Sequence, residues 1–169
     1  MVRLTEVERR CEVGELPHEN TVAAFRFSPN GSYIVTAGSR SSARLWKVSS
    51  AEELVRFSHD SDINDVAFSD DGRYVATGSN DHTARVWEVP GAQEVALLPH
   101  PDSVYRVAFS PNRRQLATAS WDRVVRLWRW QQQDLLAEAC AGVRRNLTAE
   151  EWQRHLGEEP YRKTFNESQ

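Results

Sequence analysis

A period of 41 residues runs through most of this chain. Three tryptophans follow one another at that interval, and each is preceded by a histidine 28 positions earlier: Trp46, Trp87, Trp128 and His18, His59, His100. Between these markers the pentapeptides Phe-Ser-Pro-Asn-Gly, Phe-Ser-Asp-Asp-Gly and Phe-Ser-Pro-Asn-Arg start at Phe27, Phe68 and Phe109. A fixed period of about 40 residues indicates stacked supersecondary units. Side chains that recur at every period are therefore expected to build the fold, and function must be sought in those that vary.

Each period predicts four short β-strands. Runs rich in Val, Leu, Phe and Tyr alternate with Asn, Asp, Gly and Pro turns, and no run is long enough to favour a helix. The predicted strands cover residues 22–27, 33–38, 43–48 and 53–57; 63–68, 74–79, 83–89 and 94–98; and 104–109, 115–120, 124–130 and 134–139.

The two ends of the chain differ from the repeats. Residues 3–18 align with residues 85–100 at an offset of two periods, with Thr5 in the place of Trp87. Residues 1–17 are thus predicted to be the third and fourth strands left from a preceding unit. In the tail, 141–169, Thr148 and Glu151 form a capping box and predict a short helix at 149–156. We expect this helix to dock through Trp152 or Leu156 on Trp130.

Composition narrows the class of protein. The chain has 169 residues and a net charge of −3 with both signs intermixed, which does not indicate nucleic-acid binding. Two cysteines, Cys11 and Cys140, form neither a disulfide framework nor a zinc motif. The charged start is no signal peptide, and no apolar run reaches the roughly 18 residues of a membrane span. A cytoplasmic protein without membrane contact is expected.

The repeated pattern resembles the WD-repeat β-propeller family over residues 2–140. The resemblance is carried by the histidine, by Phe-Ser-x-x-Gly, by the strands at 34–37, 75–78 and 116–119, by Asp81 and Asp122, and by the closing Arg-Leu-Trp, Arg-Val-Trp and Arg-Leu-Trp. It implies an all-β fold: a partial, open propeller of three four-stranded antiparallel blades plus a half blade, with a short C-terminal helix. The three units would be 18–58, 59–99 and 100–140.

The tail, from Asn146 to Thr164, looks like the segment after the last blade of large bacterial WD-repeat proteins. Those proteins often carry an N-terminal signalling NTPase or a kinase-like region. The similarity implies that this chain is the C-terminal portion of such a protein, or a gene reduced to that portion.

The resemblance also implies a buried hydrogen-bond chain in each unit, from histidine through a hydroxyl and an aspartate to tryptophan. The residues that match are His59, Thr77, Asp81 and Trp87; His100, Thr118, Asp122 and Trp128; and His18, Thr36 and Trp46. Arg40 replaces the aspartate of the first unit, so that network is expected to be incomplete, with a looser turn. Ser79 and Ser120 are alternative hydroxyl donors. Buried imidazole and indole groups need such partners.

A catalytic interpretation and a metal-binding interpretation of these residues are both disfavoured. His59, Asp81 and Thr77 have the composition of a hydrolytic triad, but an enzyme needs one such site rather than one per repeat. Histidines spread around a propeller do not converge on a metal either. No phosphate-binding glycine loop is present. No catalytic residue, metal ligand or cofactor is therefore predicted.

Two slots vary between the units and are the candidates for partner binding. Ser39, Asn80 and Trp121 occupy the turn before the network residue, and Ala23, Asn64 and Tyr105 occupy the start of the first strand. The resemblance implies that both slots open on one face. Tyr105, Trp121 and Arg123 have the composition of an interaction hot spot, with Asn64 and Asn80 beside them. The alternative is that Trp121 packs over its own turn or on a neighbouring blade.

A non-catalytic protein–protein interaction scaffold is the expected function. The alternative is the sensor or regulatory end of a bacterial signalling NTPase or kinase whose catalytic region is absent or separately encoded. Propellers close with 4–8 blades, so three units would leave Val22, Phe25 and Phe27 without a neighbour. Three alternatives follow: a fragment of a longer protein, a marginally stable gene product, or a ring assembled from copies of the chain. The expected partners are other proteins, further blades or copies of itself.

Overall fold

Every regular element is a β-strand in the residues that the computed structural model describes, namely 2–6, 11–18, 21–38 and 41–131. The strands coincide with runs of apolar and β-branched residues, and turn formers separate them, as local propensity favours. In chain order they are β1 (Val2–Glu6), β2 (Cys11–Leu16), β3 (Val22–Phe27), β4 (Tyr33–Gly38), β5 (Ser42–Lys47), β6 (Glu52–Ser58), β7 (Ile63–Phe68), β8 (Tyr74–Ser79), β9 (Thr83–Glu88), β10 (Gln93–Pro99), β11 (Val104–Phe109), β12 (Gln115–Ser120) and β13 (Val125–Arg129).

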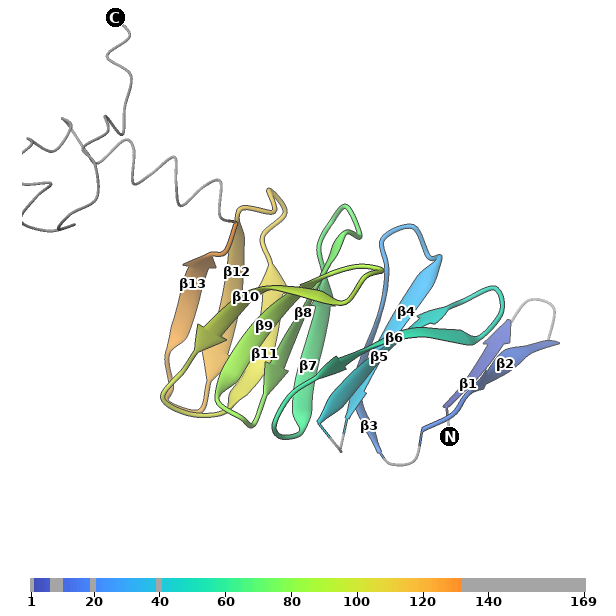
Figure 1. Ribbon diagram of the computed structural model, residues 1–169, viewed down its shortest axis with the longest axis horizontal. Coiled ribbons are helices and arrows are strands. Elements are labelled where there is room, and N and C mark those ends of the chain that lie inside the picture. The colour runs from blue at the N-terminus through green and yellow to red at the C-terminus, as the bar shows by residue number, and fades with distance from the viewer. Residues whose placement is uncertain (1, 7–10, 19–20, 39–40, 132–169) are drawn as a thin grey trace, which may run out of the picture. The chain divides into compact units, whose positions relative to one another are not determined.

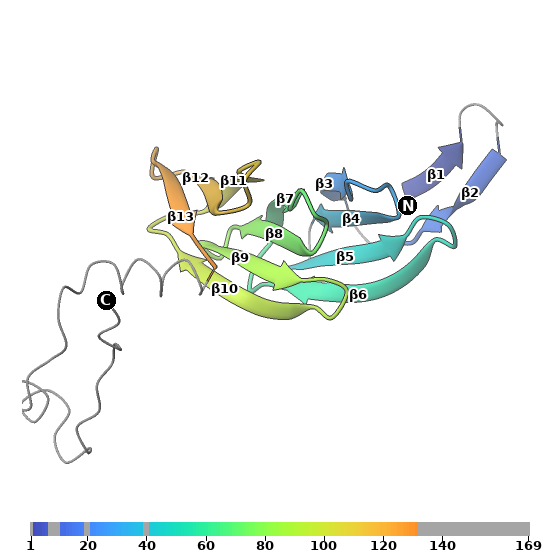
Figure 2. The same ribbon diagram turned by 90° about the horizontal axis from the view of Figure 1, so that it is seen from above.

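These strands form antiparallel sheets in which neighbours in sequence are neighbours in space. Blade 1 is β3-β4-β5-β6, blade 2 is β7-β8-β9-β10, and blade 3 is β11-β12-β13, while β1 and β2 pair as a hairpin. The sheets follow one another in chain order (Figure 1). Seen from above, the first strands β3, β7 and β11 lie along one edge, and the fourth strands β6 and β10 lie along the other (Figure 2).

The predicted fold class is confirmed: the described residues are all-β, and their sheets form an open, partial propeller. The first and second strands of the three units match the predicted limits to the residue. The chain divides into two compact units, Met1–Gln131 and Gln132–Gln169. The second unit, with the predicted strand at 134–139 and the predicted helix at 149–156, lies outside the described residues.

The recurring serine explains the turn after each first strand. Ser69 Oγ donates to Asp71 Oδ1 at 2.7 Å and accepts the Tyr74 N–H at 3.0 Å. Gly72, with φ of 69°, closes the turn by donating its N–H to the Ser69 carbonyl at 2.9 Å. Glycine adopts this left-handed conformation without strain. In the third unit Arg113 takes the same conformation, at φ of 62°.

The core consists of apolar layers between adjacent blades rather than one central cluster. Blades 1 and 2 share a layer that includes Leu45, Phe57, Ile63, Val66 and Trp87. Blades 2 and 3 share a layer that includes Val86, Val104, Val107, Leu116 and Trp130. Full burial of one such side chain contributes roughly 1.5–3 kcal/mol. Each blade is therefore stabilised by its neighbours.

Glycine at position 78 lets blade 3 approach blade 2 closely. A Cβ added to Gly78 would lie 2.9 Å from Val104 Cγ1, closer than carbon atoms normally come. Ala37 and Ala119 stand at the equivalent positions of the other units.

The two outer faces of the described blades expose apolar side chains. Phe25 and Phe27 on β3 are exposed, as expected from the sequence, whereas Val22 is half-buried. Val125 and Leu127 on β13 are exposed on the opposite flank. One period away, Val66 and Val86 occupy the positions of Phe25 and Leu127 and are fully buried. Inside the stack, a neighbouring blade covers these positions.

Candidate functional site

Blade 2 contains a continuous hydrogen-bond chain that joins its four marker residues. Trp87 Nε1 donates to Thr77 Oγ1 at 2.9 Å, and Thr77 Oγ1 lies 2.6 Å from His59 Nε2. His59 Nδ1 lies 2.7 Å from Asp81 Oδ2. One proton arrangement satisfies every contact: His59 donates from Nδ1 to the carboxylate, and Nε2 accepts the Thr77 hydroxyl proton. The chain ties β8, β9 and the two turns at one end of the blade together.

The charge states of the pair follow from burial and hydrogen bonding. Burial lowers the pKa of His59 below its usual value, although the Asp81 carboxylate opposes this shift. Burial alone would raise the pKa of Asp81, but hydrogen bonds from Thr83, the Asp60 N–H and His59 lower it to about 2. At neutral pH the pair is thus a neutral imidazole beside an ionised carboxylate.

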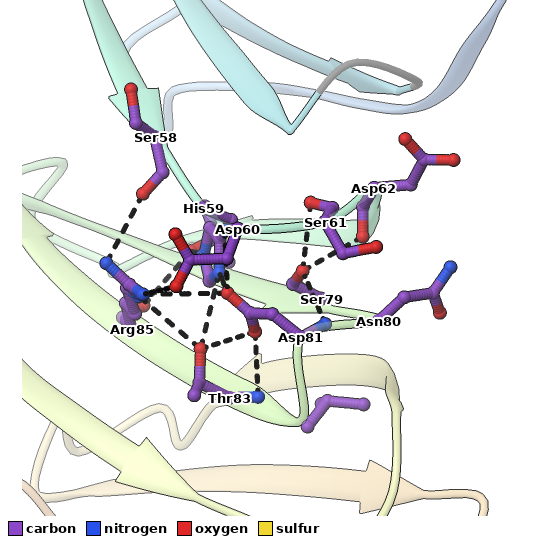
Figure 3. A network of polar contacts seen from close by, with 12 residues as sticks. Ser58, His59, Asp60, Ser61, Asp62, Ser79, Asn80, Asp81, Thr83 and Arg85 are labelled. Carbon is purple, nitrogen blue, oxygen red and sulfur yellow. Dashed lines mark hydrogen bonds and ion pairs between the residues drawn. The ribbon is translucent and has the colours of Figure 1, made fainter.

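Asp81 is held from several sides, which fixes its orientation toward the histidine. Its Oδ1 accepts the Thr83 hydroxyl at 2.6 Å and the Thr83 N–H at 2.9 Å, and its Oδ2 accepts the Asp60 N–H at 3.1 Å. Arg85 Nη2 forms an ion pair with Oδ2 at 3.5 Å. Figure 3 shows these groups converging on the one carboxylate. A carboxylate with this many donors is a structural anchor.

Blade 3 repeats only part of this chain. Trp128 Nε1 donates to Thr118 Oγ1 at 2.8 Å, and Thr118 Oγ1 lies 2.7 Å from His100 Nε2. His100 Nδ1, however, donates to the Leu98 carbonyl at 2.9 Å. Asp122, which the sequence places in this network, instead forms an ion pair with Arg126 at 2.6 Å. A backbone carbonyl therefore takes the place of the expected carboxylate.

In blade 1 the hydrogen-bond chain is the shortest of the three. Trp46 Nε1 donates to Thr36 Oγ1 at 2.8 Å, and His18 packs on Trp46 with ring centroids 5.6 Å apart. His18 Nε2 is buried without a hydrogen-bond partner among the described residues. Arg40, at the position of the missing aspartate, and the turn predicted to be looser there lie outside the described residues.

The threonine of the blade 2 network is enclosed by its partners. Thr77 is fully buried, and its oxygen already contacts both the imidazole and the indole. Blade 3 repeats this part of the arrangement at Thr118. Among the residues described, no three His, Cys, Asp or Glu side chains gather closely enough to hold a metal ion.

In blades 2 and 3 the residues of the two variable slots contact each other. Tyr105 and Trp121 are in ring contact, with centroids 5.3 Å apart, and remain 38% and 65% exposed. In blade 2 the counterparts also meet, since Asn64 Nδ2 donates to Asn80 Oδ1 at 2.7 Å. The first-strand slot is also a β-bulge: the register with the second strand shifts around Ala23, Asn64 and Tyr105. Bulges re-aim side chains and often lie next to functional sites.

Two other sequence-predicted residues have definite places. Arg123 occupies the left-handed position of the turn after Trp121, with φ of 68°, and its N–H donates to the Ser120 carbonyl. The ring of Trp130 is buried against Tyr74 and Phe109, at centroid distances of 4.7 and 5.5 Å. Tyr74 belongs to β8 of the neighbouring blade and Phe109 to β11 of the same blade. The tail helix that was expected to dock on Trp130 lies outside the described residues.

The model of the family described as WD domain, G-beta repeat matches the chain three times, at residues 10–47, 52–88 and 92–129. The chain belongs to this WD-repeat family. Each match begins with the last strand of one sheet and ends with the third strand of the next, so that the matches contain β2–β5, β6–β9 and β10–β13. A WD repeat in sequence and a blade in space are thus offset by one strand.

Solved WD-repeat structures share the fold. "Structure of U3-55K" matches with a TM-score of 0.64 and 28% identity, and covers 67% of this chain and 37% of that one. "Crystal structure of RRP9 WD40 repeats" matches with the same TM-score and identity, and covers 67% of this chain and 36% of that one. The WD repeats described here thus span little more than a third of those chains. No curated protein matches the sequence.

Three charged residues that the repeat pattern did not single out lie on the first strands of the three blades. Asp65 on β7 is buried between Arg26 of β3 and Arg106 of β11. A signal was available: the residues one and two periods after Arg26 are Ala67 and Ala108, so the charge breaks the repeat.

The described part of the chain contains no helix with the length and hydropathy of a membrane span.

Proposed function

We propose that this chain is a non-catalytic protein-interaction module that presents Tyr105 and Trp121 to a partner protein. One observation supports this most strongly: two large aromatic side chains from different strand ends touch each other and still expose much of their surface. Paired aromatic rings of this kind are typical of interface hot spots. The blades provide the rigid support, since their networks fix the strands on both sides of the pair.

Variation between the WD repeats points to the same place. Asn64 and Asn80 join by a hydrogen bond where blade 3 has the aromatic pair. A scaffold requirement would repeat the same residues, as it does for Thr36, Thr77 and Thr118. The asparagines are proposed to extend the interaction surface with polar contacts, and Arg123 to border it.

A photocross-linking experiment tests this function. Benzoylphenylalanine is placed at Trp121 or at Tyr105, and, as a matched control, at Leu97, an exposed apolar residue on β10. We expect the first two positions to trap the same partner protein in cells of the source organism and Leu97 to trap none. Tyr105→Ala and Trp121→Ala should each weaken binding of that partner by about tenfold or more. Equal trapping at Leu97, or full binding by both alanine variants, would reject the proposed surface.

We also propose that the apolar flanks are contact surfaces for further WD blades, from another chain or from a second copy. Phe25 and Leu127 are exposed at positions where Val66 and Val86 are covered by a neighbouring blade. Light scattering after size-exclusion chromatography tests self-association: Phe25→Asp with Leu127→Asp should convert an oligomer to a monomer. A wild-type chain that is monomeric at all concentrations would favour a blade from another protein.

Within the cell, the cytoplasm is the proposed location. Free thiols at Cys11 and Cys140, without a disulfide framework, suit a reducing compartment.

A further inference from the structure

Three charged residues that break the repeat converge on the first strands of the three blades. Asp65 on β7 stands where blade 1 has Ala24, and Arg26 on β3 stands where the other blades have Ala67 and Ala108. Arg106 on β11 takes the same position as Asp65, one period later. A feature that the scaffold needed would recur in each unit. This cluster, Arg26–Asp65–Arg106, occurs once.

The cluster leaves an excess of positive charge. Asp65 is only 2% exposed, and its Oδ2 accepts the Val107 N–H at 3.1 Å. Its Oδ1 faces both guanidinium groups, with Arg26 Nη2 at 3.5 Å and Arg106 Nη1 at 3.7 Å. Two cations therefore share one carboxylate oxygen at long range. One net positive charge remains on this inner edge.

Both arginines are accessible to a ligand. The side chains of Arg26 and Arg106 are 53% and 66% exposed, whereas the carboxylate between them is buried. The buried anion thus holds the two guanidinium groups close together, and much of their surface remains open to solvent. Guanidinium groups bind carboxylates with strong, directional hydrogen bonds.

The cluster adjoins the aromatic pair. Arg106 follows Tyr105 directly in β11, and their Cα atoms are about 3.8 Å apart. The bulge at Tyr105 interrupts the regular alternation of side chains at this point. A segment that lies along this part of β11 therefore passes both residues.

We infer that the partner binds through a segment in which an acidic side chain stands next to an apolar or aromatic one. The apolar residue contacts Tyr105 and Trp121, and the carboxylate pairs with Arg106 and Arg26. This inference rests on the proposed interaction function and adds the chemistry of the partner. An acidic peptide fits better than a nucleic acid, because one excess charge on a chain of net charge −3 is no phosphate-binding stripe.

The experiment uses a library of random 12-residue peptides displayed on phage and selected on the full chain. Enriched peptides are synthesised with a fluorescent label, and their affinities are measured by anisotropy. We expect them to carry Asp or Glu at a fixed, short spacing from an aromatic or aliphatic residue. Replacing that acid by its amide should weaken binding about threefold to tenfold, and added salt should also weaken binding.

Three variants of the protein separate ligand binding from a structural role. Arg106→Gln and Arg26→Gln should each weaken the peptide about threefold to tenfold without changing the urea midpoint. Asp65→Asn should tighten it about threefold, because the competing carboxylate charge is gone. A purely structural cluster predicts the opposite for Asp65→Asn: lower stability and no gain in affinity. Arg113→Gln, which breaks the ion pair with Asp71 on another turn, is the matched control and should bind normally.

Each outcome decides between the two proposals. If peptides lose binding to Trp121→Ala but not to Arg106→Gln, the acidic-segment inference is wrong and the interaction surface stands. If they bind Tyr105→Ala and Trp121→Ala fully, the proposed function fails. Enrichment of peptides without acids, no enrichment at all, or tighter arginine-dependent binding of a 12-nucleotide RNA would each overturn the inference.

Discussion

Blades 2 and 3 carry the same four marker residues but connect them differently. In blade 2 the hydrogen-bond chain ends at a carboxylate, because His59 Nδ1 lies 2.7 Å from Asp81 Oδ2. In blade 3 the histidine ends on the Leu98 carbonyl, and Asp122 pairs with Arg126. The shared part, from tryptophan through threonine to histidine, therefore defines the blade. The aspartate is an addition that depends on its surroundings.

One neighbouring residue that differs between the two blades is the one two positions after the aspartate. Thr83 in blade 2 donates its hydroxyl and its N–H to Asp81 Oδ1 and so directs the other oxygen at His59. Its counterpart in blade 3 is Val124, whose N–H still reaches Asp122 Oδ1 at 3.0 Å but which has no hydroxyl. Without that second donor, the carboxylate pairs with Arg126 in the blade's third strand.

The largest expected effect comes from the central threonine. Thr77→Val keeps the shape but leaves the Trp87 N–H and His59 Nε2 buried without partners, which should cost about 2–4 kcal/mol of unfolding free energy. Thr36→Val in blade 1 leaves only the Trp46 N–H unpaired and should cost about 1–2 kcal/mol. Urea unfolding measures both. Equal losses would mean that the bond to His59 contributes nothing.

The aspartates should differ next. Asp81→Ala removes the acceptor of the Thr83 hydroxyl, the Asp60 N–H and His59, at a cost of about 2 kcal/mol. Asp122→Ala should cost clearly less, because His100 keeps its bond to the Leu98 carbonyl. The same urea series compares them. A larger loss at Asp122 would contradict the view that blade 3 does not depend on its carboxylate.

Acid should destabilise the fold in two steps. The pKa values of His59 and His100 are lowered by burial, so protonation favours the unfolded chain once the pH falls below about 6.5. The Asp81 pKa, at about 2 in the fold and near 3.9 when unfolded, adds a further loss of about 1 kcal/mol between pH 4 and pH 2 after screening. Urea midpoints across pH measure both, and Asp81→Asn should flatten only the lower step.

The smallest effect is a conversion of blade 3 toward blade 2. Val124→Thr adds a hydroxyl where Thr83 has one, and we expect Asp122 to turn toward His100. A nearby carboxylate favours the imidazolium, so the pKa of His100 should rise, as a histidine C–H titration by NMR would show. Val125→Thr at the next residue is the control and should leave that pKa unchanged. No shift in the first variant would mean that Thr83 does not direct Asp81.

Much of the fold follows from local sequence. The first two strands of every unit were predicted to the residue, because Phe-Ser-x-x-Gly, or Phe-Ser-x-x-Arg in the third unit, fixes the turn between them. The third and fourth strands differ from prediction by one or two residues, as at Glu52–Ser58. These outer strands contain charged residues and a bulge, so no apolar pattern marks their ends.

The sites were harder to predict. Comparison of equivalent positions in the repeats predicted only that Tyr105 and Trp121 lie on one face. Whether their rings touch depends on the geometry of the bulge at Tyr105. The Arg26–Asp65–Arg106 cluster joins residues 39 to 41 positions apart, and no local pattern reveals such an approach. The same holds for Trp130, whose ring meets Tyr74 across a blade boundary.

The offset of one strand between repeat and blade has a mechanical consequence. Detaching one repeat from the array would take the outermost strand away from the sheet before it, because β6 and β10 pair with strands of the previous repeat. Consecutive repeats therefore share a sheet. Force or proteolysis that frees one repeat must also break the strand-pairing hydrogen bonds of its neighbour, so local unfolding of one repeat affects the next.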